Sequence, residues 1–175
     1  GGLNVYGQLL TSSITASGPV DIEAGGEYTY LSNPPAGCVT GIICAANGAS
    51  PYGGNVYVNG SITTTGQPIT ILAGQAVANS IAPGGMHVGG GLNISSNGGA
   101  IKLSNIDVNG NGSTVGFDNG RGVAVGFGNL TTIDAGGGNI DLSATASTNG
   151  VDLNNAALIT AGSGTITLTG VGDGG

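Results

Sequence analysis

One short unit recurs along this chain, and it constrains the fold more than any other feature. The unit is an Ile, a second Ile seven positions further on, and Ile or Leu two residues later, with Gly before the second Ile. Repetition at this scale is typical of architectures in which successive copies stack on one another. The copies are Ile62–Ile71, Ile94–Leu103, Ile133–Leu142, Ile159–Leu168 and, one residue shorter, Ile14–Ile22.

Each copy is predicted to form a strand, a turn and a second strand. Apolar residues alternate with Thr, Lys or Asp in the second half, which is the period of a strand buried on one face. Strands this short cannot bury an apolar face alone, so each Ile is expected to lie on the equivalent Ile of the next coil. The expected stacking residues are Ile14, Ile22, Ile62, Ile69, Ile71, Ile94, Ile101, Leu103, Ile133, Ile140, Leu142, Ile159, Ile166 and Leu168.

The predicted fold is therefore all-β, a right-handed parallel β-helix that forms one domain over residues 1–175. The alternative is an antiparallel β-sandwich or jelly roll, which also uses short alternating strands and Gly turns. A sandwich does not by itself require the same unit to recur. A second resemblance, between Asn4-Val-Tyr6 and Asn55-Val-Tyr57, suggests that the repeat extends upstream of the unit.

Composition supports ordered β-structure and excludes several classes of function. Gly accounts for 38 of 175 residues and charged residues for 6%, while 39% are hydrophobic, which is too apolar for a disordered chain. With two Lys and Arg residues against nine Asp and Glu, the chain has no basic surface for nucleic acid. No apolar run approaches the ~18 residues of a membrane-spanning helix.

Residues 28–54 match no copy of the unit and are predicted to leave the stack as an inserted loop. Pro34 and Pro35 do not fit a hydrogen-bonded ladder. Cys38 and Cys44 are expected to form a local disulfide that holds this loop, with two free thiols as the alternative. The loop is either decoration or a contact surface, because it holds three of the five tyrosines.

The chain offers little catalytic chemistry, and we expect that it is not an enzyme. His87 is the only histidine and lies in a Gly-rich stretch without an adjacent nucleophile or acid. The nine acidic residues are dispersed, whereas glycoside hydrolysis needs a close pair of carboxylates. No cofactor is expected, apart from the calcium ion considered next.

One constellation has the spacing of a calcium loop. Asp107, Asn109, Asn111 and Asp118 occupy positions 1, 3, 5 and 12, with Gly112 at position 6, as in an EF-hand. The strand-like flanks and the short side chain at position 12 favour instead a simple turn between coils, since Asn-Gly turns arise freely in such a chain. The calcium site remains an expectation for these four residues.

Thr-x-Thr occurs at residues 63–65, 165–167 and 167–169, and regularly stacked threonines on a solenoid can form an ice-binding face. Such a face needs Thr on every coil at equivalent outward positions. The outward positions of the second strand hold Asp21, Thr70, Lys102, Asp141 and Thr167, so this row is interrupted.

The units ITAGSGTITLTG, IDAGGGNIDLSA and ISSNGGAIKLSN resemble the repeats of filamentous-haemagglutinin-like adhesins, which are exported by two-partner secretion and built on long right-handed β-helices. The resemblance implies an extracellular, surface-attached structural or adhesive role without catalysis. Expected partners are further copies of the chain or adjacent repeats of a longer chain, with cell-surface glycans as a further class. The alternatives are a pilin-like sandwich subunit that exchanges strands with its neighbours, and a carbohydrate-binding or ice-binding β-solenoid.

Overall fold

The protein is a parallel β-helix, and every pair of neighbouring strands is parallel. The computed structural model describes residues 3–6, 9–10, 13–24, 56–73, 85–106, 121–146, 148–154 and 157–172. The parallel pairing excludes the antiparallel sandwich for these residues, because a sandwich is built from antiparallel hairpins. The predicted fold class is confirmed.

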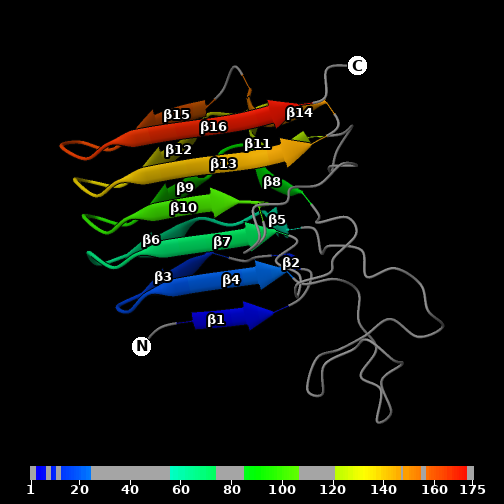
Figure 1. Ribbon diagram of the computed structural model, residues 1–175. Helices are drawn as coiled ribbons and strands as arrows, with labels where there is room; N and C mark the ends of the chain where they lie inside the picture. The colour runs from blue at the N-terminus through cyan, green and yellow to red at the C-terminus, as the bar shows by residue number, and fades with distance from the viewer. Residues whose placement is uncertain are drawn as a thin grey trace, which may run out of the picture.

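The strands form three sheets, here called A, B and C, with successive coils stacked from the N-terminal to the C-terminal end (Figure 1). Sheet A contains β1 (Leu3–Tyr6), β4 (Val20–Ala24), β7 (Ile69–Ala73), β10 (Ile101–Ser104), β13 (Ile140–Ala146) and β16 (Ile166–Gly172). Sheet B contains β2 (Leu9–Leu10), β5 (Val56–Val58), β8 (Met86–Gly89), β11 (Arg121–Phe127) and β14 (Asn149–Leu153). Sheet C contains β3 (Ile14–Ala16), β6 (Ile62–Thr64), β9 (Asn93–Ser95), β12 (Thr131–Asp134) and β15 (Ala157–Thr160).

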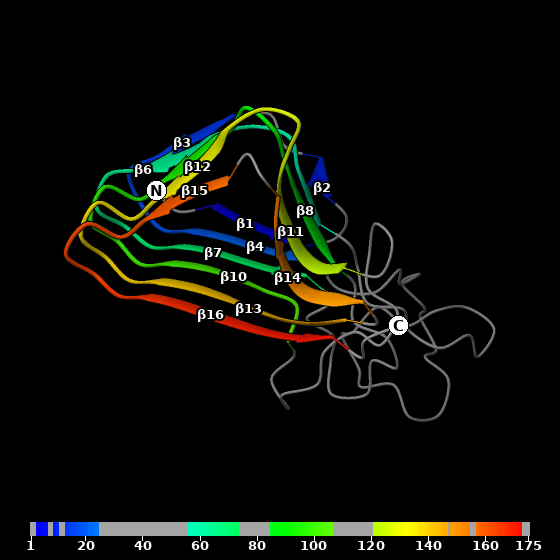
Figure 2. The same cartoon turned by 90° about the horizontal axis from the view of Figure 1, so that it is seen from above.

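Each coil passes through sheet B, then sheet C, then sheet A. Seen from above, the three sheets enclose one core, and the chain turns counter-clockwise while it rises towards the viewer (Figures 1 and 2). The coil is therefore right-handed, which is the hand that parallel crossovers in β-structure adopt almost without exception.

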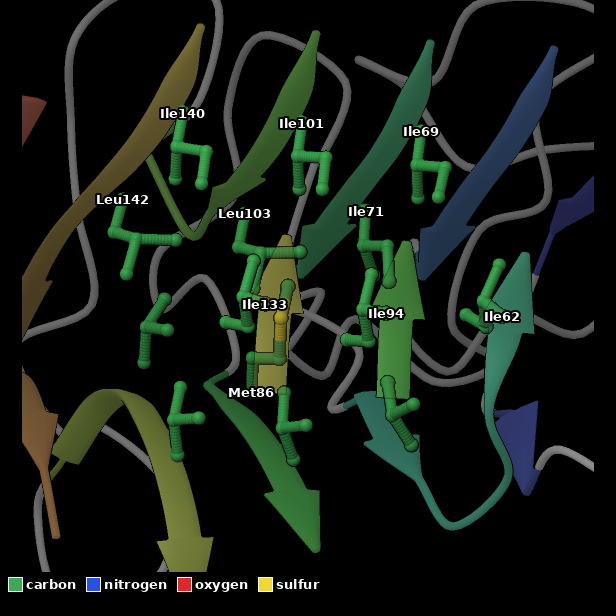
Figure 3. Close-up of a cluster of buried hydrophobic side chains, with 14 of the residues drawn as sticks. Ile62, Ile69, Ile71, Met86, Ile94, Ile101, Leu103, Ile133, Ile140 and Leu142 are labelled. Carbon is green, nitrogen blue, oxygen red and sulfur yellow. The ribbon is translucent and has the colours of Figure 1, made fainter. Parts of the chain in front are cut away.

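The Ile unit corresponds to the sheet C strand, the turn that follows it and the sheet A strand. Ile69, Ile101 and Ile140 are aligned on successive strands of sheet A, and their side chains point into the same core (Figure 3). Ile62, Ile94 and Ile133 are aligned in the same way on sheet C. Alternation follows the expected period, since β7 and β13 bury every second residue completely.

The repeat does extend upstream of the unit, by the sheet B strand, but Asn4-Val-Tyr6 and Asn55-Val-Tyr57 do not occupy equivalent positions. Tyr6 belongs to β1 and pairs with Glu23 in sheet A, whereas Tyr57 belongs to β5 and pairs with Leu10 in sheet B. The third strand of each coil is the sheet B strand, which carries no copy of the Ile unit. Its apolar residues include Val56, Met86 and Val123, which are aligned and fully buried.

Candidate assembly interface

The C-terminal end of the solenoid exposes the apolar core. Ile166 and Leu168 of β16 continue the sheet A alignments of Ile140 and Leu142, but they are 42% and 51% exposed. Ile140 and Leu142, one coil below, are 1% and 0% exposed. The difference arises because, in the part of the chain that the structure describes, no coil covers β16.

Sheet B ends in the same way. Leu153 of β14 continues the alignment of Val88 and Val125, which are fully buried, and is itself 38% exposed. Ile159, the last member of the sheet C alignment, is partly buried against the core. Among the described strands, β14, β15 and β16 each have one edge without a strand partner. Unpaired N–H and C=O groups beside exposed apolar side chains make a template for a further coil.

Hydroxyl groups inside the turns hold the coils in register. Thr64 and Ser96 are both buried, and each donates a hydrogen bond to a carbonyl of its own turn, Thr64 to Gln67 and Ser96 to Gly99, both at 2.5 Å. Each hydroxyl also lies 3.2 Å from a carbonyl of the next coil, that of Ser96 and Ala135 respectively. Buried hydroxyls are thus satisfied within and between coils, as a buried polar group requires.

Glycine allows the turns between sheets C and A to stack closely. A Cβ at Gly138 would meet the carbonyl of Gly99 in the coil below, and one at Gly164 would meet the carbonyl of Gly138. Only a residue without a side chain permits this backbone-on-backbone contact. The same turns use the left-handed conformation at Gly136, with φ of 59°, and at Asn97, with φ of 51°.

Asn105 extends the ladder of sheet A beyond the end of β10. Its backbone N–H donates to the carbonyl of Ser143, and its side-chain amide both donates to the carbonyl of Thr145 at 2.7 Å and accepts from the N–H of Thr145 at 2.9 Å. The amide therefore replaces a strand backbone where the chain leaves the sheet. Asn105 is fully buried, so these bonds are formed away from solvent.

The outer faces of the sheets differ in charge. Sheet A carries Asp21, Lys102 and Asp141 in one aligned row with Thr70 and Thr167. This is the row that was expected to be interrupted.

Sheet B carries a polar patch on its outer face. The rings of Tyr57 and His87 lie with centroids 6.2 Å apart, and Arg121 Nε forms an ion pair with Asp152 Oδ2 at 2.5 Å. His87 is aligned with Tyr57 and Ala124 on the neighbouring strands, neither of which is an acid or a nucleophile of a catalytic triad. Among the described residues, no group of three or more His, Cys, Asp and Glu side chains is arranged to hold a metal ion.

Several expected features fall outside the described residues. These are the inserted loop at 28–54 with its proposed disulfide between Cys38 and Cys44, and the four residues of the calcium loop, Asp107, Asn109, Asn111 and Asp118.

An aligned row of five polar residues on the outer face of sheet C, four of them with a hydroxyl, was not predicted from the sequence. Thr15, Thr63, Ser95, Asp134 and Thr160 are aligned strand to strand. The signal was present, because each of these residues directly follows the first Ile of a unit. The row of outward positions that the sequence showed to be interrupted belongs instead to the second half of the unit, which forms sheet A.

Comparison with known proteins adds no assignment. No family model, no curated protein and no solved structure matches this chain. None of the described segments is a helix of the length and apolarity needed to cross a membrane.

Proposed function

We propose that this chain is a structural unit of an extracellular filament or shaft, in which a further coil stacks on its C-terminal end. The observation that carries the proposal is the pair Ile166 and Leu168, which continue two fully formed core alignments and are left about half exposed. Apolar surface removed from water contributes about 25 cal/mol per Å². An open strand edge beside this surface adds backbone hydrogen bonds to the same contact.

The occupant we favour is a second copy of the chain. Sheet A has six strands and sheets B and C have five, so β1 lies below the first complete coil. Pairing of β1 in one copy with β16 of another continues sheet A, whereas the first described strands of sheets B and C in that copy, β2 and β3, lie one level further along the axis. Leu3 and Val5 pair with Val20 and Ile22 in sheet A. They therefore begin the same two rows of aligned residues of which Ile166 and Leu168 are the last members. Adjacent repeats of a longer chain would use the same register.

The composition of the chain supports the structural role and predicts how assembly depends on salt. A continuous buried apolar core, in a chain of which 6% of the residues are charged, suits a structural or adhesive role at a cell surface. The net charge of −7 makes copies repel at long range, and this repulsion is screened by salt. Assembly is therefore expected to be more extensive at 0.15 M salt than at low ionic strength.

The test is electron microscopy of the full chain with matched lysine variants. The wild type is expected to form filaments with a layer spacing of ~4.8 Å along the axis. Leu168→Lys places a charge in the stacking contact and is expected to abolish them. Thr167→Lys, on the adjacent outward position of the same strand, is expected to leave them intact. A wild-type protein that stays monomeric at all concentrations and salt conditions would refute the proposal.

A further inference from the structure

The outer face of sheet C carries hydroxyl and amide side chains on successive strands. One row contains Thr15, Thr63, Ser95, Asp134 and Thr160, and a second contains Ser61, Asn93, Thr132 and Leu158. The strands lie ~4.8 Å apart, so similar groups recur at this interval along the solenoid axis. Each coil contributes one short strand to this face (Figure 2).

This face is almost without charge, unlike those of sheets A and B. Its two rows contain one ionisable residue, Asp134, and the Oδ1 of Asp134 accepts a hydrogen bond from the N–H of Gly136 at 2.9 Å. Sheet A carries three charged residues in one row, and sheet B carries the Arg121–Asp152 pair. Depletion of charge is a property of the centres of protein interfaces.

Two of the most exposed leucines of the described chain lie beside these rows. Leu158 is 49% exposed on the outward side of β15, next to Thr132. Leu130 is 60% exposed and immediately precedes β12. The face therefore combines exposed leucine side chains with neighbouring side chains that are mostly uncharged and carry hydroxyl groups.

The links that lead from sheet C to sheet A are short in every coil. The long links of the chain all lie between a sheet A strand and the following sheet B strand, at residues 25–55, 74–85 and 105–120. The links from sheet C to sheet A are the short turns at residues 17–19, 65–68, 96–100, 135–139 and 161–165.

We propose that the outer face of sheet C is a lateral contact between two copies of this chain, which pairs neighbouring filaments. The inference rests on the proposed function. In a two-fold symmetric contact each patch meets an identical patch, so any charge faces a like charge. A hydroxyl both donates and accepts hydrogen bonds, so a hydroxyl face is complementary to itself. Asp134 is the one charged residue in the two rows of sheet C, against three in the row of sheet A, so a two-fold pair through sheet C brings together the fewest like charges.

The symmetry axis runs parallel to the solenoid axis. Both copies then point in the same direction, as they must in a polar filament. This arrangement brings the C-terminal coils of the two copies level with each other, so that Leu158 meets the Leu158 of the second copy. An antiparallel pair would instead place Leu158 against the hydroxyls of the first coils and leave both leucines without an apolar partner.

The size of the face makes the contact depend on filament formation. Five strands at ~4.8 Å, each about 13 Å long, give about 300 Å² per copy. A stable interface buries about 800 Å² per partner, so two isolated copies are not expected to pair. Filaments repeat the contact on every unit, and linked contacts gain from their high effective concentration.

The test measures filament width by electron microscopy for the wild type and three lysine variants. The wild type is expected to show filaments two solenoids wide. Leu158→Lys, on the outer face of sheet C, is expected to give single filaments of unchanged layer spacing. Thr167→Lys, an equally exposed position on sheet A in the same coil, is expected to keep the double width, and Leu168→Lys is expected to remove filaments altogether.

The outcomes separate the two proposals. Single-width wild-type filaments, or double filaments that persist in Leu158→Lys, would overturn the lateral contact while the proposed stacking stands. Absence of wild-type filaments would overturn both. An independent readout is Leu158→Cys, which should form an intermolecular disulfide between the two introduced cysteines in filaments, identified by mass spectrometry of the linked peptides. A disulfide that forms equally well with Thr167→Cys would count against the assignment to sheet C.

Discussion

Leu103 and Leu168 occupy the same core alignment and allow burial to be compared with position in the stack. Leu103 lies between Ile71 and Leu142 and is fully buried, whereas Leu168 lies on Leu142 in the terminal coil and is 51% exposed. Leu→Ala at either site removes the same atoms. The two variants therefore differ only in the surroundings of the side chain, which makes them a matched pair.

The expected losses follow from these exposures. Leu103→Ala leaves a cavity in a packed core and should lower the free energy of unfolding by about 2–5 kcal/mol. Leu168→Ala should lower it by about 1 kcal/mol. Full burial of a Leu side chain contributes about 1.5–3 kcal/mol, about half of the Leu168 side chain is buried, and its removal leaves no cavity. When a further coil covers Leu168, the other half becomes buried. In Leu168→Ala the assembled state lacks this additional burial, again about 1 kcal/mol, which corresponds to about a fivefold rise in the critical concentration for assembly.

Two measurements test this reasoning. Urea denaturation of the unassembled protein gives the loss of stability for each variant, and sedimentation of filaments at a series of concentrations gives the critical concentration. Leu103→Ala should lose at least twice as much stability as Leu168→Ala. Equal losses would show that Leu168 is not at an open end, and an unchanged critical concentration in Leu168→Ala would show that this end does not take part in assembly.

Three further predictions concern the coils themselves. Gly138→Ala should lower stability more than Gly128→Ala in urea denaturation, because a Cβ at Gly138 meets the backbone of the coil below, whereas Gly128 has open space and suffers only the ~1–2 kcal/mol of its left-handed conformation. Asn105→Ala should lower stability by about 1–3 kcal/mol for each backbone group of Thr145 that it leaves unpaired, and should speed hydrogen exchange of the Thr145 amide. A Gly-Ser-Gly-Ser insertion in the link between β7 and β8 should lower the melting temperature by less than the same insertion in the turn between β12 and β13, because lengthening a long link costs little. Equal losses of stability in the two glycine variants, or equal falls in melting temperature for the two insertions, would contradict the stacking argument.

The sequence was sufficient to predict sheet C and the strands of sheet A other than β1, because these strands belong to one unit of nearly fixed length. The turn between them, for example Ala135–Asn139, leaves no room for insertion, so Ile133 and Ile140 keep the same spacing in successive copies. The direction of the side chains followed from the period of two. The parallel stacking followed from the recurrence of the unit itself.

Sheet B could not be predicted in the same way. Its strands share no template, since one row of aligned residues contains Tyr57, His87, Ala124 and Asp152. What they share is only that Val and Met point inwards. The distance from sheet A to sheet B varies along the chain, so the start of each sheet B strand cannot be found by counting from the preceding unit.

The exposure of the C-terminal coil could not be predicted from the sequence either, although Ile166 and Leu168 were predicted as stacking residues. Ile166 and Leu168 are indistinguishable from Ile140 and Leu142 in the pattern of the unit, and only the position of β16 at the end of sheet A leaves them exposed. A repeat pattern specifies which residues stack but contains no information on where stacking stops. In a repeat protein this boundary is set by capping, through a polar outer face on the terminal repeat.

The distribution of links explains how one fold can combine a strict repeat with variable segments. Every coil needs two tight corners, and here these are the turns from sheet B to sheet C and from sheet C to sheet A. In the second of these, Gly99, Gly138 and Gly164 pack backbone on backbone, so a longer turn in one coil would separate it from the next. The third corner, from sheet A to sheet B, carries links that range from residues 147–148 to residues 25–55. Variation confined to one corner leaves the sheet C face and the terminal edges unaltered, and these are the surfaces through which the proposed contacts form.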